Sequence, residues 1–194
     1  MAPPLKHPDR EILDRAVERF WVHGYGSTTI RDLEQALDLS APSIYHRFGS
    51  KDALFLCVIE HYVETVILPR ISKYLGVSED PIVDLYRFFR TAQSPRGCML
   101  TNTAIELGPT SSVIRERTER GIEAIHNGLL AEAQRVHDRG ISVGQPVALA
   151  QALLLDLQGL MVMSRLGIGQ EELRQRTQMV FFARFGEKFR PRAK

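Results

Sequence analysis

Residues 24–54 contain the side chains of this chain that are best suited to chemistry, and their types favour binding over catalysis. Hydroxyl, phenol, imidazole and basic groups follow one another in Ser40-Ala41-Pro42-Ser43-Ile44-Tyr45-His46-Arg47-Phe48 and in Ser50-Lys51. The apolar spacing around them predicts two short helices joined by a tight turn, with another helix directly behind. Such a helix-turn-helix is shaped to place its second helix in the major groove of DNA.

The rest of the sequence lacks the spacings that catalysis or metal binding needs. It has no glycine loop for phosphate, no pair of cysteines at metal-binding spacing and no serine-elbow motif. His126 and His137 are too far apart to be two ligands on one helix face. Cys57 and Cys98 are too few for a disulfide framework, which favours a cytoplasmic protein. We expect no enzyme activity, no metal and no cofactor.

Capping residues mark where the predicted helices of this stretch begin and end. An apolar stripe in residues 12–20 predicts a preceding helix that ends at Gly24. Asp38 lies in the turn, where a short polar side chain tolerates a left-handed backbone. The expected N-caps of the three following helices are Thr28, Ser40 and Ser50.

In the order and spacing of these motifs, residues 12–54 resemble the DNA-binding head of the TetR-type repressor family. The matching positions are Gly24, Tyr25, Thr28, Thr29, Ala36, Ser40, Tyr45, Phe48, Ser50 and Lys51. A second, weaker similarity to one branch of the family lies in residues 97–104. The resemblance implies a helix-turn-helix DNA-binding domain at residues 1–52 and an effector-binding and dimerisation domain at residues 53–194.

The resemblance also implies which side chains contact DNA. The start of the recognition helix would meet base edges, while hydroxyl, phenol and basic groups would hold phosphates. Arg31 and Arg47 are candidates for further base contacts. The complete expected set is Thr28, Thr29, Arg31, Ala41, Pro42, Ser43, Tyr45, His46, Arg47 and Lys51. The alternative is that Tyr45 packs in the core of its helix and Ser43 faces solvent.

Charge supports DNA binding only weakly. The chain has a formal net charge of +2, and residues 1–60 contain seven Lys or Arg against nine Asp or Glu. The head is therefore not a basic domain, unlike many strong DNA binders. Binding requires Arg31, Arg47 and Lys51 on the side that faces DNA, with the acidic groups on other sides.

Beyond the head, the sequence predicts one helix after another and no strand-like alternation. The expected helices span about 51–72, 98–107 and 111–139, and others begin near 78, 146 and 170. With the head, this gives an all-α protein of about nine helices. At 194 residues and 44% hydrophobic composition, it is an ordinary soluble chain. Polar residues interrupt its most apolar segment, residues 147–163, which argues against a membrane span.

The last two predicted helices are candidates for a dimer interface. The helix from Pro146 is apolar nearly all round, so it should be buried against its own core and against a partner. We expect a four-helix bundle with close approach at Gly159, and a charge at Phe181 should dissociate it without unfolding the chain. The candidate interface residues are Leu157, Gly159, Leu160, Phe181 and Phe185. The alternative is that these side chains fill the core of the monomer.

By resemblance, the helices behind the head enclose an effector pocket. The candidate lining residues are Tyr86, Phe89, Met99, Asn102, Ile125, Asp156 and Met161, with simple core packing as the alternative. Asn102 and Glu106 lie one helical turn apart, so either could orient a polar group. Apolar walls with a few polar groups fit a small, largely apolar effector. Cys98, close to Arg96, could be a redox sensor, and a small buried hydrophobe is the simpler interpretation.

These features together predict a ligand-responsive, sequence-specific transcriptional regulator, a repressor that works in the cytoplasm on double-stranded DNA. A single helix-turn-helix reads only a few base pairs, so a homodimer on a palindromic operator is the physical route to specificity. A small-molecule effector that favours another spacing of the two recognition helices would release the DNA. The alternative is a helical interaction module that acts through a protein partner.

Overall fold

The computed structural model describes residues 9–141 and 144–190, and all regular elements in these residues are helical. Three short helices form the head: α1 (Asp9–His23), α2 (Ile30–Leu37) and α3 (Ala41–Phe48). A long helix follows, made of α4 (Lys51–Tyr62), a π-helical segment (Val63–Ile67) and α5 (Leu68–Tyr74). The body adds α6 (Pro81–Ala92), α7 (Met99–Leu107), α8 (Ser112–Asp138), α9 (Pro146–Arg165), α10 (Gln170–Phe185) and a 3-10 turn (Gly186–Lys188).

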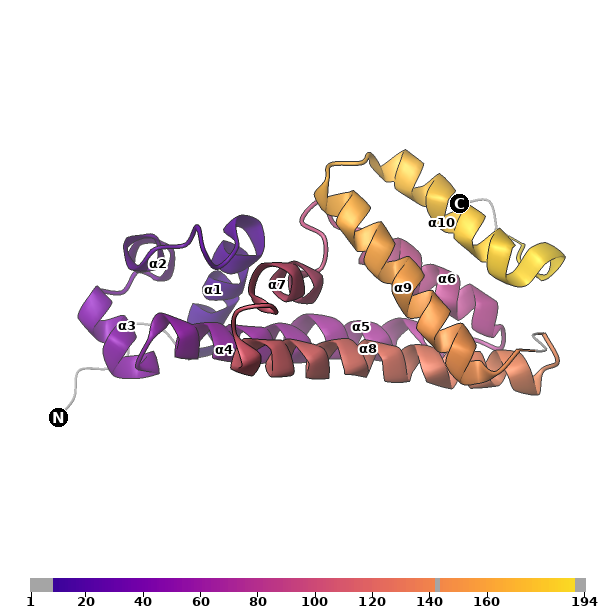
Figure 1. Cartoon of the computed structure of the whole chain (residues 1–194), viewed down its shortest axis with the longest axis horizontal. Helices are drawn as coiled ribbons and strands as arrows, with labels where there is room; N and C mark the ends of the chain where they lie inside the picture. Colours follow the sequence, from indigo (N-terminus) through magenta and orange to yellow (C-terminus); the bar gives the residue numbers. More distant parts are fainter. Residues whose placement is uncertain (1–8, 142–143, 191–194) are drawn as a thin grey trace.

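The molecule is elongated, with the head at one end and α9 and α10 towards the other (Figure 1). The α4–α5 helix and α8 run side by side along its length, and α7 lies between the head and α9. With α4–α5 counted as one helix, the described residues contain the nine helices that the sequence predicts. The prediction of an all-α chain with a helix-turn-helix head is confirmed.

The N-cap of α2 is Thr29 rather than the predicted Thr28. The Thr29 hydroxyl accepts a hydrogen bond from the Asp32 amide (3.2 Å), and the Asp32 carboxylate accepts one from the Thr29 amide (2.8 Å). Thr28 is fully buried, and its hydroxyl donates to the Gly24 carbonyl (2.7 Å). Both threonines fit the cap pattern, but only Thr29 has an acid three residues later to complete the capping box.

The other boundaries of the head follow the prediction. Ser40 and Ser50 cap α3 and α4 by accepting hydrogen bonds from amides in the first helical turn. Asp38 adopts the left-handed conformation expected in the turn, with φ +54°. Local side-chain chemistry therefore determines where the recognition helix begins and how it is angled to α2.

α9 is long and apolar enough to cross a membrane by length and composition alone. It packs against α8 and α10 instead, and the side chains that it buries include Leu153, Leu157 and Leu160. Its one acid, Asp156, accepts two hydrogen bonds from Arg184 of α10 (2.8 and 3.1 Å). These contacts pack one side of α9 into the helical body.

A buried ionic cluster holds the loop between α5 and α6 against α8. Arg135 donates to the carboxylates of Asp84 (3.2 Å) and Glu132 (2.8 Å), which are both almost fully buried. Asp84 also accepts from the amides of Val77 (3.0 Å) and Ser78 (2.9 Å). Burial alone would raise the pKa of Asp84, but its hydrogen bonds hold that pKa below its usual value. Arg135 is thus the cation that makes two buried carboxylates tolerable.

Replacing Arg135 with Met should lower the free energy of unfolding by roughly 3–5 kcal/mol, because two buried carboxylates lose their cation. The control Arg174→Met removes a solvent-exposed pair with Glu171 and should leave the free energy of unfolding nearly unchanged. Urea unfolding followed by circular dichroism measures both. Equally small effects of the two substitutions would show that the cluster does not stabilise the fold.

Candidate DNA interface and ligand cavity

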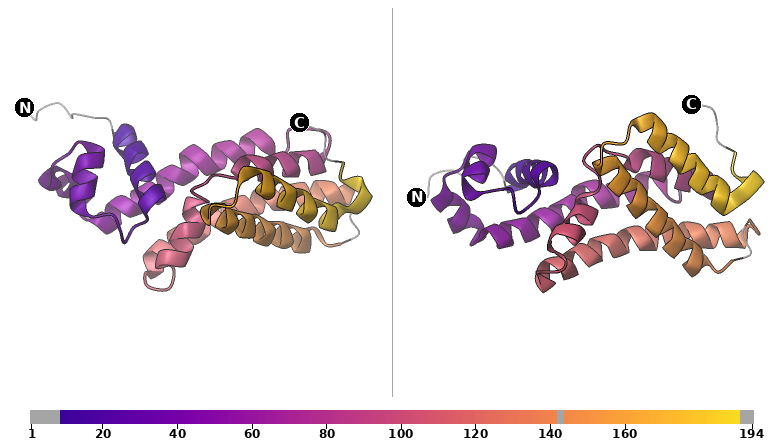
Figure 2. Two further views of the ribbon diagram at one scale, coloured as in Figure 1. Left: turned by 90° about the horizontal axis from the view of Figure 1, so that it is seen from above. Right: turned by 45° about the horizontal axis from the view of Figure 1, so that its top comes forward.

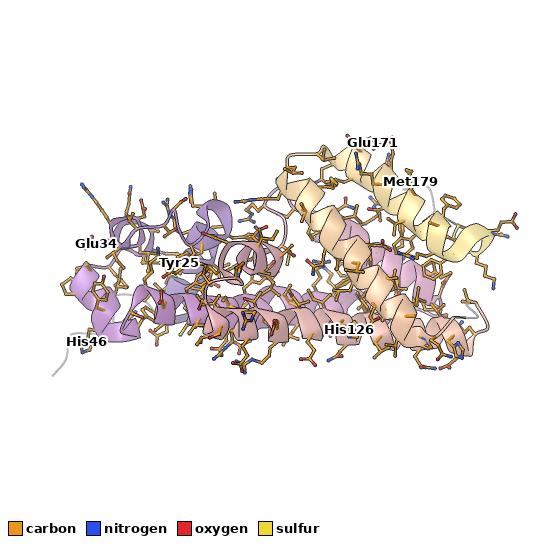
Figure 3. All side chains as sticks on the ribbon, viewed as in Figure 1. Tyr25, Glu34, His46, His126, Glu171 and Met179 are labelled. Carbon is orange, nitrogen blue, oxygen red and sulfur yellow. The ribbon has the colours of Figure 1, made fainter. Side chains whose placement is uncertain are left out.

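The recognition helix α3 presents its polar side chains to solvent. Its exposed residues are Pro42, Ser43, Tyr45 and His46, whereas Ile44 is fully buried in the core of the head. His46 lies at the outer end of the head, away from the body (Figure 3). Because Tyr45 is half exposed, it is available for contact and does not belong to the helix core.

Two residues expected at DNA are committed to the head itself. Thr28 is fully buried, so its side chain is not placed to hold a phosphate. Arg47 forms an ion pair with Asp9 of α1 (3.4 Å), and little of its side chain is exposed. Arg31 and Thr29, in contrast, are exposed on α2 and at its N-terminus. Sequence spacing could not separate side chains that are available to DNA from those bound within the head, since it does not show which neighbouring group a side chain contacts.

A carboxylate already occupies the N-terminus of α3. Glu34 of α2 accepts a hydrogen bond from the Ala41 amide (2.6 Å), a contact that the sequence analysis did not identify. A negative charge therefore lies where a helix N-terminus would otherwise offer a free amide to phosphate. DNA contact at the start of α3 must rely on side chains.

Lys51 lies at the base of the recognition helix, over the ring of Tyr25. Its ammonium donates to the Tyr25 carbonyl (2.7 Å) and lies 4.0 Å from the centre of the ring. Burial lowers the pKa of Lys51. Burial and a hydrogen bond to Asp52 raise the pKa of Tyr25 to about 12, so the phenol stays protonated as a donor. The head thus holds the Lys51 ammonium in a defined place.

Hydrogen bonds to the end of α1 hold the head on the body. Arg165 of α9 donates to the carbonyls of Trp21 (3.3 Å) and Val22 (3.0 Å). These carbonyls belong to the last turn of α1, which has no helical partner for them, and the positive charge also complements the helix dipole. The indole Nε1 of Trp21 donates to the Gly97 carbonyl (3.2 Å), just before α7.

Glu106 of α7 makes a further contact between the body and the head, at the turn that follows α1. Its carboxylate accepts hydrogen bonds from the amides of Tyr25 (3.0 Å) and Gly26 (2.6 Å). Gly24 has a φ of +80°, which other residues rarely adopt, and a Cβ there would also lie 2.9 Å from the Glu106 carboxylate, so glycine is favoured at this position. Glu106 therefore binds the head rather than orienting a ligand. We call the contacts of Trp21, Gly97, Glu106 and Arg165 the head–body joint.

A cavity of about 110 Å³ lies directly behind the head–body joint. Trp21 forms part of its wall, so a residue of the head lines a cavity of the body. The apolar lining residues include Ile67, Phe88, Ile125, Leu157 and Met161. The polar lining residues are Tyr62, Arg70, Thr91, Ser94, Cys98 and Gln158, and no Asp or Glu is among the described lining residues. The cavity thus combines apolar walls with a few polar groups, as small-molecule sites do.

The structure divides the residues expected to bind an effector among several places. Ile125 and Met161 line the cavity. Tyr86 lines a separate open groove beside α6, and Met99 and Asn102 line a surface groove between the head and α7. Helical periodicity identified these side chains as inward-facing, but it carried no information on which neighbouring helix each one meets.

Two further expected residues have other partners. Phe89 packs edge-on against Phe181 in the core, with ring centres 5.1 Å apart, and Asp156 forms its ion pair with Arg184. Neither belongs to the described lining of the cavity. The sequence analysis missed Trp21 and Arg70, which come from segments far apart along the chain.

Cys98 is a buried residue of the cavity wall at the N-cap of α7. The Tyr62 hydroxyl lies 4.0 Å from its sulfur and is placed to donate to it. Burial raises the pKa of Tyr62 well above its usual value. The burial of Cys98 matches the simpler interpretation of the sequence, a small buried hydrophobe.

The predicted dimer anchors belong to the core of the protomer. Leu157, Leu160, Phe181 and Phe185 are all buried within the single chain, as the alternative interpretation held. A charge at Phe181 should therefore unfold the chain, contrary to the expectation from sequence. Gly159 differs from these residues, because a Cβ there would meet open space.

Other apolar side chains of α9 and α10 are exposed. Leu155 is 72% exposed, Met179 69% and Phe182 49%. The two helices lie side by side at the surface (Figure 2), and Met179 points away from the body (Figure 3). We call Leu155, Gly159, Met179 and Phe182 the exposed apolar face. Several large apolar side chains exposed on two neighbouring helices make this a candidate contact surface.

Sequence comparisons identify relatives across most of the chain. Residues 12–58 match the family described as bacterial regulatory proteins, tetR family. The HTH-type transcriptional repressor ComR of Escherichia coli is 29% identical over 178 residues, which cover 86% of this chain and 84% of ComR. The HTH-type transcriptional repressor DhaR of a Mycobacterium species is 24% identical over 183 residues, 90% of each chain.

Solved structures share the fold. A cysteine mutant of the TetR family regulator CifR, in complex with a 26-base-pair operator, has a TM-score of 0.83 and 24% identity and covers 93% of this chain and 99% of CifR. A TetR transcriptional regulator from Chloroflexus aurantiacus has a TM-score of 0.77 and 26% identity, with 89% and 91% covered. These relatives are regulators rather than enzymes. With its helix-turn-helix head, exposed recognition helix and helical body, this chain belongs to the TetR family of DNA-binding transcriptional regulators.

Proposed function

We propose that the protein is a cytoplasmic repressor that binds a palindromic operator as a homodimer and releases it when a small effector occupies the cavity. The position of Trp21 carries this proposal. A residue of the DNA-binding head forms a wall of the cavity and is hydrogen-bonded to Gly97. A ligand that displaces this wall also strains the contact that orients the head.

The proposed division between the DNA-binding and effector-binding units lies near residue 52, at the start of α4. The first part of α4 still packs on the head, since Phe55 lies edge-on to Phe20 with ring centres 4.8 Å apart. The same helix continues through α5 to the cavity, where Arg70 lies. A continuous helix of this kind is a rigid connection between the two units.

For the DNA contacts, we propose the exposed part of the expected set. Ala41 and Pro42 offer apolar contact to thymine methyl groups, and Ser43 is the hydrogen-bonding group at the start of α3. Phosphates would be held by the remaining exposed or half-buried side chains, Thr29, Arg31, Tyr45, His46 and Lys51. CifR, which shares this fold, is described in complex with a 26-base-pair operator, and this supports DNA binding by a head of this kind.

For the dimer, we propose that the exposed apolar face packs on its copy across a two-fold axis. Met179 and Phe182 supply apolar area, and Gly159 permits close approach of two α9 helices. Half-sites of a palindromic operator lie about 34–36 Å apart or a multiple of it. A ligand that favours another separation of the heads lowers DNA affinity by the difference in its binding free energy to the two forms.

Replacing Lys51 with Met should weaken DNA binding and reduce the slope of log affinity against log salt by about 1, because one phosphate contact is lost. The Met side chain keeps the aliphatic part over Tyr25. The control Arg120→Met removes an exposed cation from α8, on the body, and should change neither value. Fluorescence anisotropy with a duplex selected from a random library by the wild-type protein measures both. An unchanged slope for Lys51→Met, with an intact fold, would refute the phosphate contact.

Replacing Met179 or Phe182 with Glu should dissociate the dimer while the chain stays folded. Each substitution places a charge on an apolar surface that is exposed in the protomer and covered in the proposed dimer. In contrast, Phe181→Glu should unfold the chain, since Phe181 is fully buried in the protomer. Sedimentation velocity and circular dichroism separate the two effects. A monomeric wild type, or a dimeric Met179→Glu variant, would argue against this interface.

Replacing Arg165 with Gln should lower operator affinity several-fold without dissociating the dimer, because the last carbonyls of α1 lose their cation and the head becomes less well oriented. The control is Arg176→Gln on α10, which removes an exposed pair with Glu172 and does not touch the head. Anisotropy titration of the same selected duplex measures the change. Equal affinities of the two variants would mean that the head–body joint does not orient the head for DNA.

A further inference from the structure

Arg70, on α5, is the one charged residue among the described residues that line the cavity. Its Nη2 donates to the Phe88 carbonyl (2.8 Å), and its guanidinium lies 4.3 Å from the centre of the Phe88 ring. These contacts keep the side chain in one place. Its Nε is buried and has no hydrogen-bond partner among the described residues. A donor of the guanidinium is therefore left without an acceptor.

No carboxylate balances this charge within the described residues. Several other arginines of the body have acidic partners, as Arg135 has Glu132 and Arg117 has Glu60. Arg70 forms no such pair, and burial lowers its pKa below the usual value. A cation that is largely shielded from solvent and has no counter-charge is unfavourable unless something else pairs with it. The missing acceptor and the missing counter-charge would both be supplied by an anion.

The space beside Arg70 has a polar and an apolar part. Tyr62, Thr91 and Gln158 add polar side chains to the lining, and Ile125, Leu157 and Met161 form apolar walls. A planar guanidinium matches the two oxygens of a carboxylate, which it can bind with parallel hydrogen bonds. The cavity of about 110 Å³ has the volume of about four water molecules, at ~30 Å³ each, so the ligand must be small.

We propose that the effector is a small organic acid whose carboxylate binds Arg70 and whose apolar part lies against Ile125, Leu157 and Met161. This inference rests on the proposed effector function and names the chemical class of the ligand. It also replaces the expectation of a largely apolar effector, since the charged end supplies much of the recognition.

The only tryptophan of the chain, Trp21, lines the cavity and reports on its occupancy. The test titrates the full-length protein with benzoate and butyrate, and with benzamide and butyramide as neutral partners of the same shape. We expect at least one acid to change the fluorescence of Trp21 at a concentration at least tenfold lower than its amide requires. Arg70→Met should remove this preference, with at least a tenfold loss of acid affinity and no loss of amide affinity.

The control variant is Arg90→Met, which removes an exposed cation of α6 beside a separate open groove. It should keep the acid preference of the wild type. If Arg70→Met does not fold, Arg70→Gln takes its place with the same expectation. Equal binding of acid and amide, acid binding that survives the loss of Arg70, or no binding of either acid would each overturn the inference.

An operator assay separates this inference from the proposed function. The acid that binds should raise the concentration of protein needed to bind the selected duplex, and it should not do so for Arg70→Met. If an acid binds through Arg70 and operator affinity stays the same, the carboxylate site stands and the proposed effector function fails. If amides release the duplex as well as acids do, the effector function stands and the carboxylate inference fails.

Discussion

The structure depends most on the way the end of α1 is held by the body. A helix leaves its last carbonyls without partners, and the turn after α1 adds amides that also need them. Here Arg165 supplies the donors for the carbonyls of Trp21 and Val22, and Glu106 supplies the acceptor for the amides of Tyr25 and Gly26. Backbone groups that any helix end exposes are thus used to orient the DNA-binding head.

Two residues of the head–body joint, Trp21 and Gly97, also line the cavity. Gly97 accepts the hydrogen bond from Trp21, and a Cβ at Gly97 would lie 2.9 Å from the Met161 carbonyl of α9. The loop before α7 therefore lies directly on α9, the helix that carries part of the exposed apolar face. The proposed dimer helix, the cavity and the head meet within this one set of contacts. Packed contacts of this kind have only a few alternative arrangements. A small ligand that binds one arrangement better than the others therefore shifts the population towards it.

Much of the fold follows from local sequence, because helix periodicity and capping depend on residues within a few positions of each other. The limits of α3 and α4 follow from Ser40 and Ser50, and Asp38 takes the left-handed turn conformation that its side chain tolerates. The choice between Thr28 and Thr29 as a cap depends on Asp32, which is also a local feature. In this respect the sequence contained more information than the prediction used.

The functional surfaces could be predicted only in part, because they depend on which helices become neighbours. Periodicity marks Phe181 and Phe182 as apolar, but only the packed structure shows that the first is buried in the protomer and the second is exposed. Trp21 of α1 and Arg70 of α5 line the same cavity, and no spacing in the sequence encodes that. Pairings between distant segments are a property of the tertiary fold.

In the proposed dimer, the head–body joint holds the two recognition helices at a defined separation. Electron paramagnetic resonance can measure the distance between spin labels at position 46, introduced by His46→Cys in a chain whose Cys57 and Cys98 are replaced by Ala. We expect one narrow distance distribution for this protein and a broad one when Glu106→Gln and Arg165→Gln are added, with the dimer intact. Equally narrow distributions before and after these substitutions would show that the head–body joint does not set the separation.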